Sequence, residues 1–239
     1  MRSARRCFVE DGCAQNLSFR NYQEVRIDNG NKPGRARGSG VGILAYGSLL
    51  TWPGSELHPL INERRDGVPT PFAVEFARAA SRRSGAPTLA PVETGGCSVY
   101  GSMLLLHTDV DLDQAHHLLY RREINKAGTE LTYDSHEPPS PDRVHIERLR
   151  DIEGCNHVLY ARLPATLAPD PADLARRAVA SARASSGAEG RDGISYLMGV
   201  KANGIETPLT PAYEKEILHQ TDTTSLAEAH SAARANPTT

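Results

Sequence analysis

The sequence has no surplus of one charge and no long apolar run. Its 27 Lys and Arg face 29 Asp and Glu, a net charge of −2. Balanced charge gives no sequence-wide attraction to a polyanion or to an anionic membrane surface. The longest strongly apolar stretches, such as Met103-Leu-Leu-Leu106, fall far short of the roughly 20 residues that cross a bilayer. We therefore expect a small-molecule partner, with neither nucleic acid nor membrane bound.

Closely spaced cysteine pairs are also lacking. Cys7, Cys13, Cys97 and Cys155 form no C-x-x-C motif, and a domain of this size can be stable without disulfides, which favours a reducing compartment. The first residues are basic but turn acidic by Glu10. They never develop the apolar stretch of about 7–15 residues that a secretory signal requires. The expected location is cytoplasmic.

The polarity of the chain divides it into three parts. Residues 1–40 are polar and show no sustained period of 2 or 3.6, which predicts a flexible N-terminal arm. Residues 221–239 are rich in Ala, Ser and Thr and are expected to form a C-terminal tail or a frayed helix. The intervening 41–220 is long enough for one domain with a buried core.

Strand-like and helix-like segments are mixed within this domain. Short apolar runs separated by Gly- and Pro-containing breaks predict strands, the first four of them in a mainly meandering sheet. A helix is expected from the cap Asp111 to Ile124, with Gln114 at the capping-box position. Without regular βαβ alternation, this mixture predicts an α+β fold. The expected strands are 41–46, 72–79, 88–92, 98–107, 143–150 and 157–163, and further helices are expected at 171–185 and on both sides of 203–211.

Glu123 is a candidate catalytic residue because of its place on the expected helix. At about 100° per residue it lies almost in line with Leu112, eleven positions earlier, and close to the line of Leu119. Its carboxylate therefore points along the apolar stripe of the helix. Loss of water there raises the pKa of a carboxyl group towards neutral pH, the range in which a general acid or base works. The alternative is a half-buried Glu that pairs with a neighbouring Arg, and spacing alone favours that structural role.

A second candidate site is the turn after the first expected strand, at Tyr46, Gly47, Ser48 and Leu49. Gly47 permits a tight turn, and the N–H groups that follow can form an anion-binding concavity to which Ser48 adds a hydroxyl donor. A substrate carboxylate would fit there. Taken alone, the motif is more often an ordinary turn.

Several motifs in order resemble the γ-glutamylcyclotransferase family. The opening Ile43-Leu-Ala-Tyr-Gly-Ser-Leu49 is similar to the family's strand and Tyr-Gly-Ser turn, and Gly95-Gly-Cys-Ser-Val-Tyr-Gly-Ser102 to the strand before its catalytic helix. Arg122-Glu123 matches the element that carries the catalytic Glu. The segments Gly199-Val-Lys-Ala-Asn-Gly-Ile205 and Pro211-Ala-Tyr-Glu-Lys-Glu-Ile217 look like the family's closing part. The resemblance covers about 41–220.

This resemblance implies a small mixed β-barrel flanked by helices. It implies release of 5-oxoproline from a γ-glutamyl compound, with no metal or other cofactor. Glu123 would be the general acid and base, and the loop of Tyr46, Gly47, Ser48 and Leu49 would bind the glutamyl part. Thr129-Glu130 stands where some members have an aromatic residue, so the substrate is left open among γ-glutamyl amino acids, glutathione and γ-glutamyl amines.

Two other functions remain open on the sequence. A non-catalytic protein could use the same pocket as a sensor of a small ligand, with Glu123 in a salt bridge. Acyl transfer or hydrolysis by Ser48 would instead require a nearby histidine. The sequence also leaves open whether the protein forms a homodimer.

Overall fold

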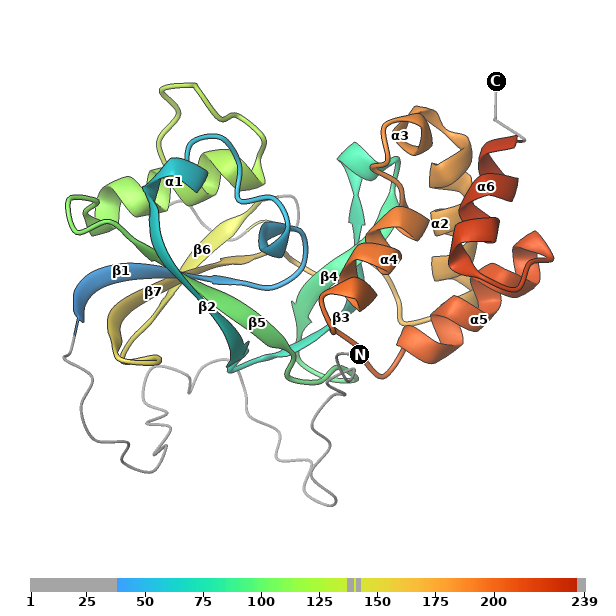
Figure 1. Ribbon diagram of the computed structural model, residues 1–239, viewed down its shortest axis with the longest axis horizontal. Helices are drawn as coiled ribbons and strands as arrows, with labels where there is room; N and C mark the ends of the chain where they lie inside the picture. The colour runs from blue at the N-terminus through green and yellow to red at the C-terminus, as the bar shows by residue number, and fades with distance from the viewer. Residues whose placement is uncertain (1–37, 137–139, 141–142, 236–239) are drawn as a thin grey trace, which may run out of the picture. The chain divides into compact units, whose positions relative to one another are not determined.

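The computed structural model describes residues 38–136, 140 and 143–235, and these fall into two compact units (Figure 1). The β-rich unit holds 38–70 and Tyr100–Leu163, and the helical unit holds Pro71–Val99 and 164–235. Within these described ranges, each unit is therefore built from two separate stretches of chain. That both belong to one functional domain over 41–220 stays a prediction. Of the expected arm 1–40, only 38–40 lie within the described residues, where they begin a strand.

The β-rich unit is built on a five-stranded sheet of order β2-β5-β1-β7-β6. Strand β1 lies in the middle, antiparallel to β5 and parallel to β7. The outer strands β2 and β6 pair antiparallel with β5 and β7, and within the described chain they do not pair with each other. The strands are β1 (Gly38–Ala45), β2 (Ile61–Pro69), β5 (Tyr100–Leu106), β6 (His145–Leu149) and β7 (Cys155–Arg162).

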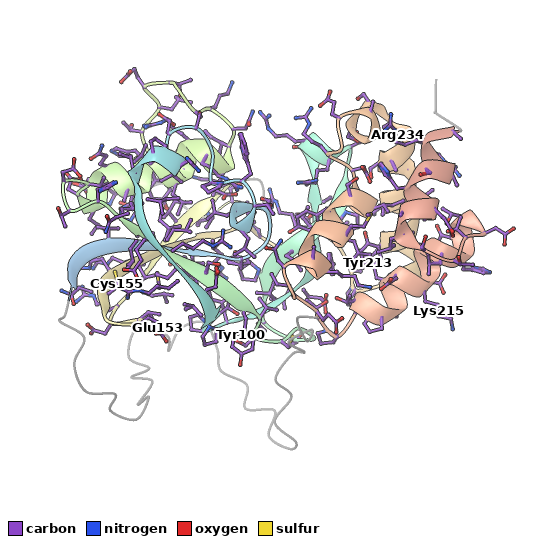
Figure 2. The ribbon with its side chains drawn as sticks, viewed as in Figure 1. Tyr100, Glu153, Cys155, Tyr213, Lys215 and Arg234 are labelled. Atoms are coloured by element: carbon purple, nitrogen blue, oxygen red, sulfur yellow. The ribbon has the colours of Figure 1, made fainter. Side chains whose placement is uncertain are left out.

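The expected meander is wrong. Strands β3 (Ala73–Ala80) and β4 (Ala86–Val92) pair with each other in a separate two-stranded sheet of the helical unit. Strand β1 instead pairs with β5 and β7, from distant parts of the chain, and these two strands satisfy the backbone hydrogen-bonding groups at both of its edges. Cys155, a buried free thiol, starts β7 beside it (Figure 2).

Helix α1 (Leu112–Glu123) packs against β7 and β6 (Figure 1). It begins as predicted, because the side chain of Asp111 accepts a hydrogen bond of 2.8 Å from Gln114 N. Its buried residues, Ala115, Leu118 and Leu119, form one stripe towards the sheet. Two short 3-10 turns, η2 (Ser48–Leu50) and η3 (His58–Leu60), lie between β1 and β2.

The helical unit packs its other helices around α2. Helix α2 contacts α3, α4, α5, α6 and strand β4, and Tyr213 on α5 is fully buried among them (Figure 2). Helices flank the loop 203–211 on both sides, as predicted, and part of the expected tail is a helix with three buried residues. The elements are η4 (Ser81–Arg83), α2 (Pro171–Arg183), α3 (Ser185–Ala188), α4 (Gly193–Ala202), α5 (Thr210–Thr221) and α6 (Leu226–Ala235). The chain is thus α+β, as its sequence predicts.

One buried carboxylate ties strand β3 to the start of α5. Glu75 is 2% exposed, and its Oε1 accepts hydrogen bonds from the Thr207 hydroxyl at 2.5 Å and from Phe76 N at 2.8 Å. Its Oε2 accepts one from Leu209 N at 3.1 Å. Burial raises the pKa of this carboxyl, against the opposing effect of the three donors.

The raised pKa of Glu75 predicts a pH dependence of stability. The folded protein holds this proton more tightly than the unfolded chain does, so the free energy of unfolding should fall as the pH rises from the unfolded value of about 4.3 through the raised pKa. Glu75→Gln should remove this part of the slope. Urea denaturation over a pH series measures it, with the exposed Glu93→Gln as control. Equal slopes for Glu75→Gln and the parent would contradict the assignment.

Candidate active site

The loop after β1 is shaped by Gly47. This residue has φ +89° and ψ −137°, a backbone conformation that glycine adopts readily and other residues rarely do. The chain then enters η2, whose turn is closed by a hydrogen bond of 3.1 Å from Leu50 N to Gly47 O. Leu49 and Leu50 are buried in the core, whereas Ser48 is half-buried. Of this turn, Ser48 therefore offers the accessible side chain.

Two side chains anchor the loop to the sheet. The hydroxyl of Tyr46 donates to the backbone oxygen of Ala161 on β7, at 2.5 Å. Arg64 of β2 donates from Nη1 to Leu50 O at 2.7 Å. Because the Tyr46 hydroxyl already donates its hydrogen to the protein, this side chain is an anchor of the loop in this structure.

A close approach of two strands fixes where the loop starts. Gly101 on β5 lies so near the end of β1 that a Cβ atom there would stand 2.2 Å from Ala45 O. No side chain fits at that distance. The glycine within Val99-Tyr-Gly-Ser102 thus lets β5 pass the residue that precedes Tyr46.

Glu123 is the last residue of α1, and its side chain is 11% exposed. This inward position agrees with the one that helical spacing predicts. Its Oε1 accepts a hydrogen bond of 2.6 Å from Arg122 Nη1. The ion pair is the structural alternative that the sequence left open. Oε2 accepts no hydrogen bond from the described residues.

Arg122 connects Glu123 to the loop. Its Nη2 donates to Ser48 Oγ at 3.2 Å and to Trp52 O at 2.6 Å, and its Nε also donates to Trp52 O at 3.2 Å. Gly54, with φ +93°, leaves room for this side chain, since a Cβ there would stand 3.1 Å from Arg122 Cγ. One guanidinium therefore holds the serine of the loop and the carboxylate of the helix in one polar site.

A second contact holds the same end of α1 against the chain that follows the loop. Arg121 donates from Nε and Nη2 to the two carboxylate oxygens of Glu56, at 3.1 and 3.0 Å. The pair is largely buried, with side chains 14% and 23% exposed. Two-point Arg–carboxylate contacts fix orientation as well as distance. This pair therefore steadies the helix end that carries Arg122 and Glu123.

The structure thus brings together two of the five predicted site residues, Ser48 and Glu123. Gly47 shapes the turn, Tyr46 anchors it, and Leu49 is a core residue at 4% exposure. Sequence reasoning missed the bridging role of Arg122. The one indication in the sequence was that Arg122 directly precedes Glu123 in the motif. Neighbouring residues of a helix point about 100° apart, so helical spacing alone could not predict that Arg122 bridges Glu123 and Ser48.

A nucleophilic role for Ser48 would need a base close by. Ser48 Oγ accepts its hydrogen bond from Arg122, and it bonds to no histidine among the residues described. An arginine is a permanent cation and cannot take the proton of the hydroxyl. This arrangement does not support acyl transfer by Ser48.

The helical unit contains a different Ser, His and Asp group. Asp192 Oδ2 accepts from Ser195 Oγ at 2.6 Å and lies 3.1 Å from His230 Nε2, and Ser195 Oγ lies 3.3 Å from the same Nε2. A catalytic triad instead uses one imidazole nitrogen for the serine and the other for the acid. Asp192 also caps α4, accepting from Ile194 N and Ser195 N. Asp192 is therefore the buried cap of α4, and its contact with His230 connects α6 to this cap.

A shallow depression of about 680 Å³ lies over the turn between α5 and α6. Glu228 on α6 accepts hydrogen bonds with its Oε2 from Thr224 N at 3.0 Å and from Thr224 Oγ1 at 2.8 Å. These bonds stabilise the start of the helix. The depression is lined by Asp222, Thr223, Thr224, Ala227, Glu228, Ser231 and Ala232.

None of the helices in the described ranges is both long and apolar enough to span a bilayer. Comparison of the sequence with models of known protein families finds no match, and comparison with curated proteins finds no similar sequence either.

Proposed function

We propose that this chain is a γ-glutamylcyclotransferase that releases 5-oxoproline, with Glu123 as general acid and base. The observation that carries the proposal is the Arg122 bridge between Ser48 and Glu123. It supports a shared site for the loop and the acid, which the order of motifs in the sequence predicts. In this proposal the five-stranded sheet is the counterpart of the family's small β-barrel.

The reaction needs positioning and proton transfer, and no side-chain nucleophile. The α-amine of the substrate attacks its own γ-carbonyl carbon, so a C–N bond forms within the five-membered lactam and the C–N bond to the leaving amine breaks. Glu123 takes one proton from the α-ammonium group before the attack and gives it to the departing nitrogen. The ring nitrogen loses a second proton as the lactam forms, and the leaving group departs with both protons as an ammonium group. Electrons and atoms balance without a cofactor. Oε2 of Glu123, which accepts no hydrogen bond from the described residues, is the acceptor available for the first proton.

A panel of γ-glutamyl compounds tests the proposal. The protein is incubated with γ-glutamyl amino acids, glutathione and γ-glutamyl amines, and 5-oxoproline is measured by mass spectrometry. We expect release from at least one compound, dependent on active protein. No release from any member of the panel would reject the proposed activity.

A ligand sensor is the second candidate, and the Arg122–Glu123 ion pair favours it. Both side chains are 11% exposed, and removing one partner of a buried pair leaves a costly uncompensated charge. A structural pair could therefore be kept without catalysis. Binding of a γ-glutamyl compound without release of 5-oxoproline would support this candidate.

A further inference from the structure

The guanidinium of Arg122 has hydrogen-bonding capacity left over. Arginine carries five N–H donors. The four hydrogen bonds to Glu123, Ser48 and twice to Trp52 O use four of them and leave one. The remaining donor is on Nη1, which makes only the bond to Glu123 among the described atoms. A second acceptor could therefore bind at Nη1 beside the Glu123 carboxylate.

Ser48 on Nη2 and Glu123 on Nη1 have unused hydrogen-bonding capacity of opposite kinds. Ser48 Oγ accepts from Arg122, and its hydroxyl hydrogen meets no acceptor in the described chain. Glu123 Oε2 meets no donor there. Two donors thus stand next to one anionic acceptor. This combination is complementary to an α-amino acid head group, in which a carboxylate and an ammonium group share one carbon atom.

From this arrangement we infer that Arg122 binds the α-carboxylate of the substrate. The inference rests on the proposed function and assigns the residue that recognises the α-carboxylate shared by γ-glutamyl amino acids, glutathione and γ-glutamyl amines. The carboxylate accepts from Nη1, first through its unused N–H and then in place of Glu123, and it also accepts from the Ser48 hydroxyl. Glu123 then pairs with the α-ammonium group. Every buried charge keeps a partner during this exchange.

The exchange also explains why the ion pair does not disable the acid. The contact between Arg122 and Glu123 is a single hydrogen bond, whereas a carboxylate can engage an arginine and a second donor together. Substrate binding would thereby release Glu123 from Arg122 when the α-ammonium group, whose proton Glu123 accepts, is in place. The leaving group lies outside this contact, so Arg122 does not select among amino acid, peptide and amine leaving groups.

Binding of two lactams tests this role without relying on turnover. L-5-oxoproline carries the carboxylate, and 2-pyrrolidinone is the same ring without it. We expect 5-oxoproline to shift the NMR signal of the Arg122 Nε–H group and to bind about 10–100-fold more weakly to Arg122→Gln, as expected for a hydrogen bond to a charged group. Binding of 2-pyrrolidinone should be the same in both proteins.

Two variants serve as controls. Arg122→Lys keeps the positive charge but has a different donor geometry, so its loss of affinity for 5-oxoproline should be intermediate. This variant keeps the test valid if Arg122→Gln does not fold. Arg150→Gln changes an exposed arginine of the same unit and should leave both affinities unchanged. Equal effects of Arg122→Gln on the two lactams, or no binding of 5-oxoproline, would overturn the inference. Carboxylate-dependent binding without release of 5-oxoproline from any substrate would reject the catalytic proposal alone.

Discussion

Replacing Glu123 by glutamine should lower 5-oxoproline release by about 10²–10⁴-fold, the usual contribution of a general acid or base. Glutamine keeps an oxygen that can accept from Arg122 Nη1, so the loop and the helix end should stay in place. It cannot take up the proton of an ammonium group. Steady-state rates on the best substrate of the panel measure the loss, and circular dichroism checks the fold.

The matched control is Glu147→Gln. Glu147 lies on β6 of the same unit, and its side chain is 44% exposed, 3.8 Å from Arg162. Exposed pairs at such a distance contribute little to stability, so this variant should retain the activity of the parent. Full activity in Glu123→Gln, with the fold intact, would refute the catalytic assignment.

Replacing Gly101 by alanine should destabilise the β-rich unit and disturb the loop. The added Cβ would stand 2.2 Å from Ala45 O and 3.7 Å from Tyr46 Cβ, so β5 and β1 must separate at that point. Forcing an extra carbon into a packed region costs about 1–3 kcal/mol. Urea denaturation measures the free energy of unfolding, and activity should fall as well, because the loop begins at the residue that is displaced.

Gly40→Ala is the control for this prediction. Gly40 lies on β1, and a Cβ there would meet nothing within 4 Å. Its stability should be close to that of the parent. If Gly101→Ala were as stable and as active as Gly40→Ala, the close approach of β5 would not determine the position of the loop.

Local sequence patterns predicted most elements but not how the strands pair. The apolar runs of β1 and β5 and the Asp111 cap of α1 are signals contained in a few adjacent residues. Strand β2 has no counterpart among the expected strands, because only Val68 in it is buried and its exposed positions alternate along a sheet edge. The parallel pairing of β1 with β7 joins residues more than a hundred positions apart, and no short-range pattern encodes such a contact.

The geometry of the candidate site was predictable from the sequence only in part. Helical spacing predicted the inward direction of Glu123, and the Gly47 turn was visible in the sequence. The roles of Arg122 and of the Tyr46 hydroxyl depend on contacts across the unit, with Ser48 and with Ala161. Such contacts arise from tertiary packing and leave no periodic signal in the chain.

The identity of the product formed in ¹⁸O-labelled water distinguishes cyclisation from hydrolysis. Cyclisation by the substrate's own amine forms 5-oxoproline without any oxygen from water, whereas hydrolysis forms glutamate with a labelled γ-carboxylate. With a γ-glutamyl substrate and the wild-type protein, we predict unlabelled 5-oxoproline as the first product, absent with Glu123→Gln. Labelled glutamate as the first product, or equal yields of 5-oxoproline from both proteins, would rule out cyclisation by Glu123.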